Sequence, residues 1–208
     1  MKNNPTIILA SGEYPTHPAP LRMLAEAERV ICCDGAANTL CANGRVPDFI
    51  IGDLDSLALE LRALHAGCVV HDPSQDTNDL SKAFHFCVQN HWRELVILGA
   101  GGGREDHLLG NISLLADFAA TGANVWMATN HGVLRAFTQS PARLESMRGQ
   151  QISIFACDPE TRATGTGFKY PLENLRLRRW WTAALNESVS QTPEIRFTRG
   201  PLIVWQSW

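Results

Sequence analysis

The chain has 208 residues, of which 45% are hydrophobic and 19% are charged, and its formal net charge is -3. This length suits one large domain or two small ones with a real core. The small net charge gives no electrostatic reason to expect a nucleic acid or an anionic membrane as a partner. The first apolar run, residues 6–10, is shorter than the hydrophobic region of a signal peptide, and no run of about 18 apolar residues occurs. We therefore expect a cytoplasmic protein without a membrane partner.

From residue 6 to about residue 128, short apolar runs alternate with longer amphipathic segments. Strands are expected at residues 6–10, 29–33, 49–51, 68–70, 95–98 and 124–127. Helices are expected at residues 19–28, 57–66, 79–90 and 107–121. This alternation predicts an α/β domain with a mainly parallel, doubly wound sheet and helices on both faces.

Acidic residues follow two of the expected strands. Asp53 and Asp55 come after the run 49–51, and an extended backbone would turn both side chains to the same side. Asp79 and Lys82 are three residues apart, on one face of the helix expected to start at residue 79. Because the carboxyl ends of parallel strands share one edge, these acids become neighbours. They suit Mg²⁺ carrying a polyphosphate, although helix capping and turn formation are also common roles for such residues.

Glycines concentrate at residues 99–103, directly before Arg104, Asp106 and His107. A glycine-rich loop that enters a helix can turn several N–H groups toward a phosphate, and an arginine can add a bidentate contact. The run matches neither G-x-x-x-x-G-K-[ST] nor G-x-G-x-x-G. The alternative is an ordinary loop with Asp106 as the helix cap and His107 as a hydrogen-bonding residue at the helix start.

After about residue 130 the pattern changes to short alternating segments. They lie at residues 133–137, 151–156, 162–170, 174–178, 194–197 and 202–205, separated by turn residues, and predict an antiparallel β-sandwich. We place the boundary within 129–143 and expect an α/β domain of residues 1–130 and a β domain of residues 131–208. The second domain is rich in aromatic residues, which serve in cores, at interfaces or in pockets for flat rings.

Five segments, in order and over nearly the whole chain, resemble the thiamine pyrophosphokinase family. Asp34-Gly35-Ala36-Ala37-Asn38 is similar to the D-G-G/A-A-N stretch of the family. Residues 52–56 are similar to G-D-[FL]-D-S, and residues 75–79 to Q-D-x-T-D. Residues 102–107 are similar to G-G-R-x-D-H, and residues 167–172 to G-L-K-Y-P-L. Together the five are far more specific than any one of them.

The resemblance implies transfer of the pyrophosphoryl group of ATP to the thiamine hydroxyl with release of AMP. It implies an ATP- and Mg²⁺-binding first domain, a thiamine-binding sandwich, and a homodimer with thiamine between the first domain of one subunit and the second domain of the other. The metal ligands would be Asp53, Asp55 and Asp79. With the chemistry of the side chains added, Asp55, Asp79, Lys82 and Arg104 are the expected catalytic residues.

The expected contacts to the co-substrate and to thiamine follow from these motifs and from residues 185–187, which are similar to a late Ser-Asn-Glu stretch of the family. Nucleotide or phosphate contacts are expected from Asp34, Gly35, Gln75, Asp76, Gly102, Gly103, Arg104, Asp106 and His107. Contacts to thiamine are expected from Tyr170, Asn186 and Glu187.

Two positions depart from the family pattern, and three other functions stay open. Leu185 stands where the family often has a serine, and Asn78 replaces the threonine of the third motif. The first departure leaves the alcohol that accepts the pyrophosphoryl group less certain than ATP as its donor. One alternative is an ATP-dependent pyrophosphokinase of another primary alcohol, such as a pterin. Another is a phosphatase with Asp53 as nucleophile. The third is a nucleotide or thiamine sensor without catalysis.

Overall fold

The structure is a computed structural model that describes residues 5–208, and the chain divides into two compact units. The first unit comprises the chain up to Leu114 together with Gly122–Asn130. The second comprises Leu115–Thr121 and His131–Trp208. No helix within residues 5–208 is long and apolar enough to cross a membrane.

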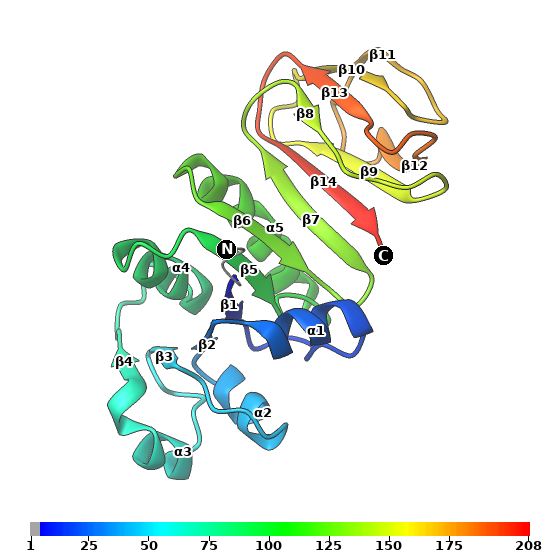
Figure 1. The fold of residues 1–208 in the computed structure, drawn as a ribbon. Helices are drawn as coiled ribbons and strands as arrows, with labels where there is room; N and C mark the ends of the chain where they lie inside the picture. Colours follow the sequence, from blue (N-terminus) through cyan, green and yellow to red (C-terminus); the bar gives the residue numbers. More distant parts are fainter. Residues whose placement is uncertain (1–4) are drawn as a thin grey trace. The chain divides into compact units, whose positions relative to one another are not determined.

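The first unit is built on a parallel sheet (Figure 1). Its strands are β1 (Thr6–Leu9), β2 (Arg29–Cys33), β3 (Phe49–Gly52), β4 (Val69–His71), β5 (Glu94–Leu98) and β6 (Asn124–Ala128). They lie in the order β6-β5-β1-β2-β3-β4, and every neighbouring pair is parallel. The expected mainly parallel sheet is confirmed. Strands β1, β2 and β5 are almost wholly buried because apolar side chains cover both faces.

Helices connect these strands: α1 (Pro18–Glu26), α2 (Ala36–Ala42), α3 (Leu59–Leu64), α4 (Asp79–Gln89) and α5 (Glu105–Ala120), with a 3₁₀ turn, η1 (Ala66–Cys68). From β1 the chain first builds outward through β2, β3 and β4, and it then returns to the other side of β1 for β5. The strand order therefore reverses at β1. In an open α/β sheet, ligands bind at the carboxyl ends of the strands beside such a reversal.

The second unit is an antiparallel sandwich, as the sequence predicted. One sheet has the order β12-β9-β14-β7 and the other β11-β10-β13-β8. The strands are β7 (Gly132–Phe137), β8 (Ala142–Arg143), β9 (Gln151–Ala156), β10 (Arg162–Thr166), β11 (Leu172–Arg176), β12 (Ala183–Glu187), β13 (Glu194–Phe197) and β14 (Leu202–Ser207). Ile154 and Val204 of one sheet and Ala163 and Ile195 of the other belong to one buried apolar cluster.

Some elements differ from the expectation. Strand β12 was not expected from the sequence. Leu185 has a φ of 59° there and the register against β9 shifts, so the side chains do not alternate regularly between the two faces. The expected strand at residues 162–170 ends early, at Thr166, because Gly167 turns the chain with a φ of 85°.

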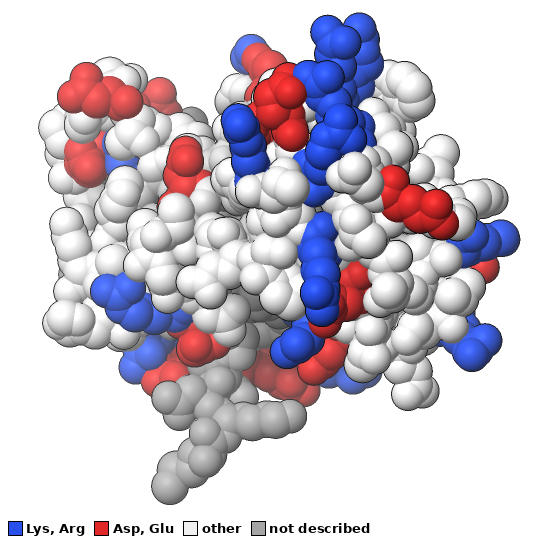
Figure 2. Space-filling model, turned by 90° about the horizontal axis from the view of Figure 1, so that it is seen from above, with Lys and Arg blue, Asp and Glu red and all other residues white. Residues whose placement is uncertain are grey.

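Basic and acidic side chains are interspersed on the face drawn in Figure 2. Lys and Arg form a narrow band there, and Asp and Glu lie close beside it. In the second unit, basic and acidic side chains also form ion pairs, as in Arg143–Glu194 and Arg199–Asp158. This face therefore lacks the continuous basic surface that is typical of nucleic-acid binding.

Candidate functional site

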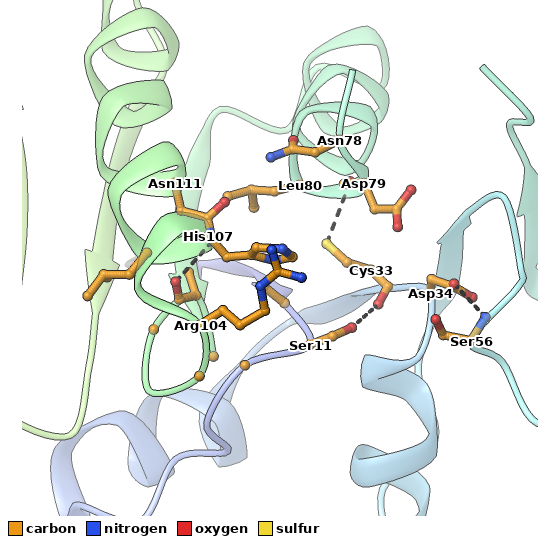
Figure 3. A pocket seen from close by; sticks show the side chains of 17 residues that line it. Ser11, Cys33, Asp34, Ser56, Asn78, Asp79, Leu80, Arg104, His107 and Asn111 are labelled. Atoms are coloured by element: carbon orange, nitrogen blue, oxygen red, sulfur yellow. Dashed lines mark hydrogen bonds between the residues drawn. The ribbon is translucent and has the colours of Figure 1, made fainter. Parts of the chain in front are cut away.

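A pocket of about 420 Å³ opens at the carboxyl ends of β1, β2 and β5 in the first unit (Figure 3). The loops after these strands line it together with the first turns of α4 and α5. Asp34, Ser56 and Asp79 lie at one end, and Arg104, His107 and Asn111 lie at the other. One end is thus acidic, and the other is formed by the glycine-rich loop and one face of α5.

The floor of the pocket consists of two loops locked together through their backbones. The N–H of Gly12 donates to the carbonyl of Gly99 at 2.7 Å, and the N–H of Glu13 donates to that of Gly101, also at 2.7 Å. A Cβ atom on Gly12 would lie 2.4 Å from the oxygen of Gly101, which is closer than real Cβ contacts. Gly102 has a φ of 72° and lies under Glu13. Gly12 is required by the close approach of two backbones, and Gly102 by its positive φ and by the side chain of Glu13.

Three carboxylates meet beside the acidic end. Asp34, Asp53 and Asp55 each offer an oxygen, and the three oxygens lie within 4.8 Å of one another. Oδ2 of Asp34 accepts the N–H of Ser56 at 3.0 Å. Its Oδ1 is buried and has no hydrogen-bond partner among the described residues. A buried acceptor next to two further carboxylates fits a hard divalent cation with oxygen ligands, such as Mg²⁺.

The electrostatics of the three carboxyls differ. Burial raises the pKa of Asp34, the hydrogen bond from Ser56 opposes this, and the nearby Asp55 and Asp79 raise the pKa further. The pKa of Asp53 is lowered, first by the hydrogen bond from the Gln75 side chain and then by the backbone N–H of Asp55. The Gln75 amide donates to Oδ2 of Asp53 at 3.0 Å. Of the three carboxylates, Asp34 is thus the least favourable one to ionise, because its ionised form is buried among like charges.

Asp53 and Asp55 approach each other through a turn, and not through the extended backbone that the sequence suggested. Strand β3 ends at Gly52, and Leu54 has a φ of 68°, so side chains no longer alternate between two faces. The N–H of Asp55 bends back toward Oδ1 of Asp53 at 3.4 Å. Leu54 is 5% exposed, and its burial stabilises this unusual backbone.

Asp79 lies near this set but is not one of the three. It begins α4, where Oδ1 of the preceding Asn78 caps the helix by accepting the N–H of Ser81 at 2.9 Å. Oδ1 of Asp79 accepts from Nζ of Lys82 at 3.1 Å. The same ammonium donates to the carbonyl of Asp72 at 3.1 Å. Asp79 lines the pocket, whereas the Lys82 side chain is only 3% exposed and does not.

The remaining expected nucleotide contacts are spread around the pocket. Gly103, Arg104 and His107 line it, while Gly35, Gln75, Asp76, Gly102 and Asp106 do not. Arg104 holds Asp106 in a bidentate pair, with Nε–Oδ1 at 3.1 Å and Nη2–Oδ2 at 2.6 Å. Both side chains are exposed, at 74% and 60%. Asp76 is exposed, and its N–H donates to Oγ of Ser74 at 3.3 Å.

The expected thiamine contacts lie together in the second unit. The buried amide of Asn186 accepts the N–H of Tyr170 at 3.1 Å and donates to the Tyr170 carbonyl at 2.9 Å. Asn186 therefore holds the backbone of Tyr170, whose side chain is 57% exposed. Glu187 pairs with Lys169 at 2.9 Å. Leu185 projects beside them and is 80% exposed.

Several residues that line the pocket were not among the expected contacts. Ser11 donates its hydroxyl to the carbonyl of Cys33 at 2.9 Å and so links β1 to β2. Ser11, Gly12 and Cys33 lie directly after or at the end of apolar runs, and this position could have indicated them as pocket residues. Asn78 and Asn111 lie in or beside helices and carry no such signal.

Replacing Lys82 by methionine should destabilise the protein. The substitution keeps the apolar stem but leaves the Asp79 carboxylate and the Asp72 carbonyl without the ammonium. We expect a loss of about 2–3 kcal/mol in the free energy of unfolding, below the range for fully buried pairs because Asp79 is 31% exposed. Urea denaturation measures this. Arg143→Met removes an exposed partner of Glu194 and should change stability by less than about 1 kcal/mol. Equal losses of stability in the two variants would contradict a structural role for the bonds of Lys82 to Asp79 and Asp72.

Replacing Gly52 by alanine should disturb the acid cluster. The new Cβ would lie 2.8 Å from Cβ of Asp34 and 3.2 Å from Oδ1 of Asp79, so one of the two side chains must move. We expect a loss of about 1–3 kcal/mol in stability, as for an overpacked interior. Gly67→Ala is the matched control, since no heavy atom lies within 4 Å of its added Cβ. Thermal unfolding of both variants measures the difference, and an unchanged Gly52→Ala protein would refute the packing described here.

Comparisons with known proteins agree over both units. The model described as "Thiamin pyrophosphokinase, catalytic domain" matches residues 21–127, and "Thiamin pyrophosphokinase, substrate-binding domain" matches residues 136–205. A thiamine pyrophosphokinase of Bacillus subtilis is 29% identical over 185 residues, covering 84% of this chain and 85% of the relative. One from Caenorhabditis elegans is 28% identical over 165 residues, covering 73% and 68%. The crystal structure of the Bacillus subtilis protein has a TM-score of 0.80 at 26% identity and covers 97% of this chain and 98% of that one. The chain belongs to the thiamin pyrophosphokinase family and has both its catalytic and its substrate-binding domain.

Proposed function

We propose that the acid cluster and pocket of the first unit transfer the pyrophosphoryl group of ATP to the hydroxyl of thiamine, giving thiamine diphosphate and AMP. Thiamine diphosphokinase activity is the activity of the family to which the chain belongs. The observation that carries the residue assignment is the meeting of Asp34, Asp53 and Asp55 beside a glycine-lined pocket.

Asp34, Asp53 and Asp55 would hold Mg²⁺ in this proposal, and Asp79 stands beside them at the pocket. The buried, unpartnered Oδ1 of Asp34 supports a cation there, because two nearby carboxylates cannot supply a proton donor while ionised. When bound, Mg²⁺ would neutralise negative charge on the phosphates. Compared with the set expected from sequence, Asp34 joins the ligands and Asp79 takes a position at their edge.

The chain's own residues would position the reactants. The backbone of the glycine loop and the guanidinium of Arg104 would bind phosphate oxygens. Lys82 would act by holding Asp79 in place. The thiamine oxygen forms a bond to the β-phosphorus of ATP, while the bond from that phosphorus to the oxygen bridging the α-phosphorus breaks. AMP leaves with that oxygen, and the hydroxyl proton passes to a base. Such transfer depends mainly on positioning and charge stabilisation.

The second unit would supply the thiamine contacts. Tyr170 presents an exposed ring on a backbone that Asn186 holds at two points, which supports a surface prepared for a flat, cationic ring. Asn186 and Glu187 stay predicted thiamine contacts in this proposal. The cytoplasmic location also stays a prediction from the sequence.

The acid assignment is tested by Asp34→Asn and Asp53→Asn, which keep the shape of each side chain and remove its charge. We expect AMP formation from ATP, Mg²⁺ and thiamine to fall about 100-fold or more, as when groups that stabilise transition-state charge are removed. Chromatography of the nucleotides measures this, and circular dichroism checks the fold. Asp117→Asn, on the exposed side of α5, is the control and should retain activity.

The outcomes also separate the alternatives. Near-normal turnover in both acid variants would overturn the metal assignment. AMP formation with a pterin but not with thiamine would identify another acceptor. Release of inorganic phosphate alone would indicate a phosphatase. Ligand binding without any AMP would indicate a sensor.

We further propose a homodimer, with the second unit at the interface. Trp181 is 74% exposed and Leu185 is 80% exposed, and large apolar side chains in such positions favour a protein contact. Sedimentation should give twice the 22.9 kDa of the chain. Trp181→Glu should shift the protein toward monomer, whereas Val46→Glu, at a residue of the first unit that is 61% exposed, should not. A monomer at all concentrations would exclude the dimer.

A further inference from the structure

Asn111 presents a fixed hydrogen-bond acceptor to the pocket. It lies on the face of α5 that lines the pocket with His107 and Leu108, at the spacing that places residues on one side of a helix. Its Nδ2 donates to the carbonyl of Ala100 at 2.9 Å. A carbonyl can only accept, so the atom that faces Ala100 is Nδ2, and the orientation of the amide is fixed. Oδ1 is the atom left for the pocket.

This oxygen has no protein partner among the described residues, and apolar side chains lie beside it together with the His107 ring. The neighbouring pocket residues are Leu80 and Ala100, each 4% exposed, and the partly buried Leu108. An acceptor beside such side chains gains from a ligand that brings an N–H or O–H group, and it is penalised when the ligand brings another acceptor. The pocket therefore selects for a donor at this point.

The position of Asn111 indicates which part of a nucleotide it meets. Asp34 and Asp79 lie at the opposite end of the pocket (Figure 3). If the metal and the terminal phosphates are held there, as the proposed function has it, the rest of the nucleotide extends toward the other end. There Arg104 would contact a phosphate oxygen, and Leu80, Leu108 and Asn111 would contact the base. Apolar side chains with a small number of polar groups among them suit a purine ring.

We propose that Oδ1 of Asn111 accepts a hydrogen bond from the exocyclic amine of adenine, and that this contact makes the site select adenine over guanine nucleotides. Adenine carries an amine at position 6, whereas guanine carries a carbonyl oxygen there. That oxygen would face Oδ1, and two acceptors repel each other. The inference rests on the proposed function, because it takes the nucleotide end of the pocket from it.

The test is equilibrium binding by calorimetry, with Mg²⁺ present and without thiamine, of three triphosphates: ATP, GTP and purine riboside triphosphate, which has hydrogen in place of the amine. We expect the wild-type protein to bind ATP about 10- to 100-fold more tightly than the other two, since the acceptor is left unpaired with them. Asn111→Ala should lower the affinity for ATP to that of the purine analogue and leave the affinity for the analogue almost unchanged. Ser113→Ala, which removes an exposed hydroxyl on the same helix, should keep the wild-type pattern.

Each outcome decides the inference. Equal binding of ATP and the purine analogue by the wild-type protein overturns it, and this comparison needs no variant. An equal loss for both nucleotides in Asn111→Ala would mean that Asn111 only supports the loop at Ala100, which also overturns it. Tight binding of ATP without a preference for its base would be consistent with the proposed function and would refute only the role of Asn111 in base selection. Absence of ATP binding by the wild-type protein would remove both.

Discussion

Three carboxylates that repel one another are held at one point of the first unit, and the rest of the site is arranged around that constraint. Like charges this close to one another disfavour the folded state, even at the effective dielectric constant usual near protein surfaces. The chain accepts this cost together with a φ of 39° at Asp34 and 68° at Leu54, and with no side chain at Gly52. Backbone strain of this kind persists where the surroundings determine it, and it concentrates at functional sites. A divalent cation bound as proposed would turn the repulsion into attraction and would account for the strain.

The parallel sheet makes this convergence possible. Asp34 follows β2 and Asp53 follows β3, and because the strands are neighbours and parallel, both residues leave the sheet at the same edge. The two loops under the pocket come from β1 and β5, which flank the point where the strand order reverses. The acids and the glycines are thus brought to one pocket by topology, although about 50 residues separate Asp53 from the glycine loop.

Sequence patterns predicted the architecture well because burial on both faces of a parallel strand produces continuous apolar runs. They also predicted which loops meet, since the order of strands and helices fixes the shared edge. The detailed geometry of the acid cluster could not be predicted from the sequence. Asp34 has a left-handed backbone and lies just before the short helix α2, which was not among the expected helices. The burial of Lys82 depends on Asp72, at the end of a neighbouring strand. Asn111 is a mid-helix asparagine with no motif, and only its bond to Ala100 reveals its orientation.

The two basic side chains nearest the site differ in how free they are to act. Lys82 is buried, and its bonds to Asp79 and Asp72 tie α4 to the end of β4, so moving it would leave a charge without a partner. Arg104 is exposed together with Asp106, so solvent screens their pair and it is easily broken. In the proposed site, a phosphate group with its greater charge would therefore compete with Asp106 for Arg104, whereas the buried Lys82 would stay paired with Asp79. The proposed site would thus combine a fixed cation, Lys82, that keeps Asp79 in place, with a movable one, Arg104, that is free to contact the phosphates of the substrate.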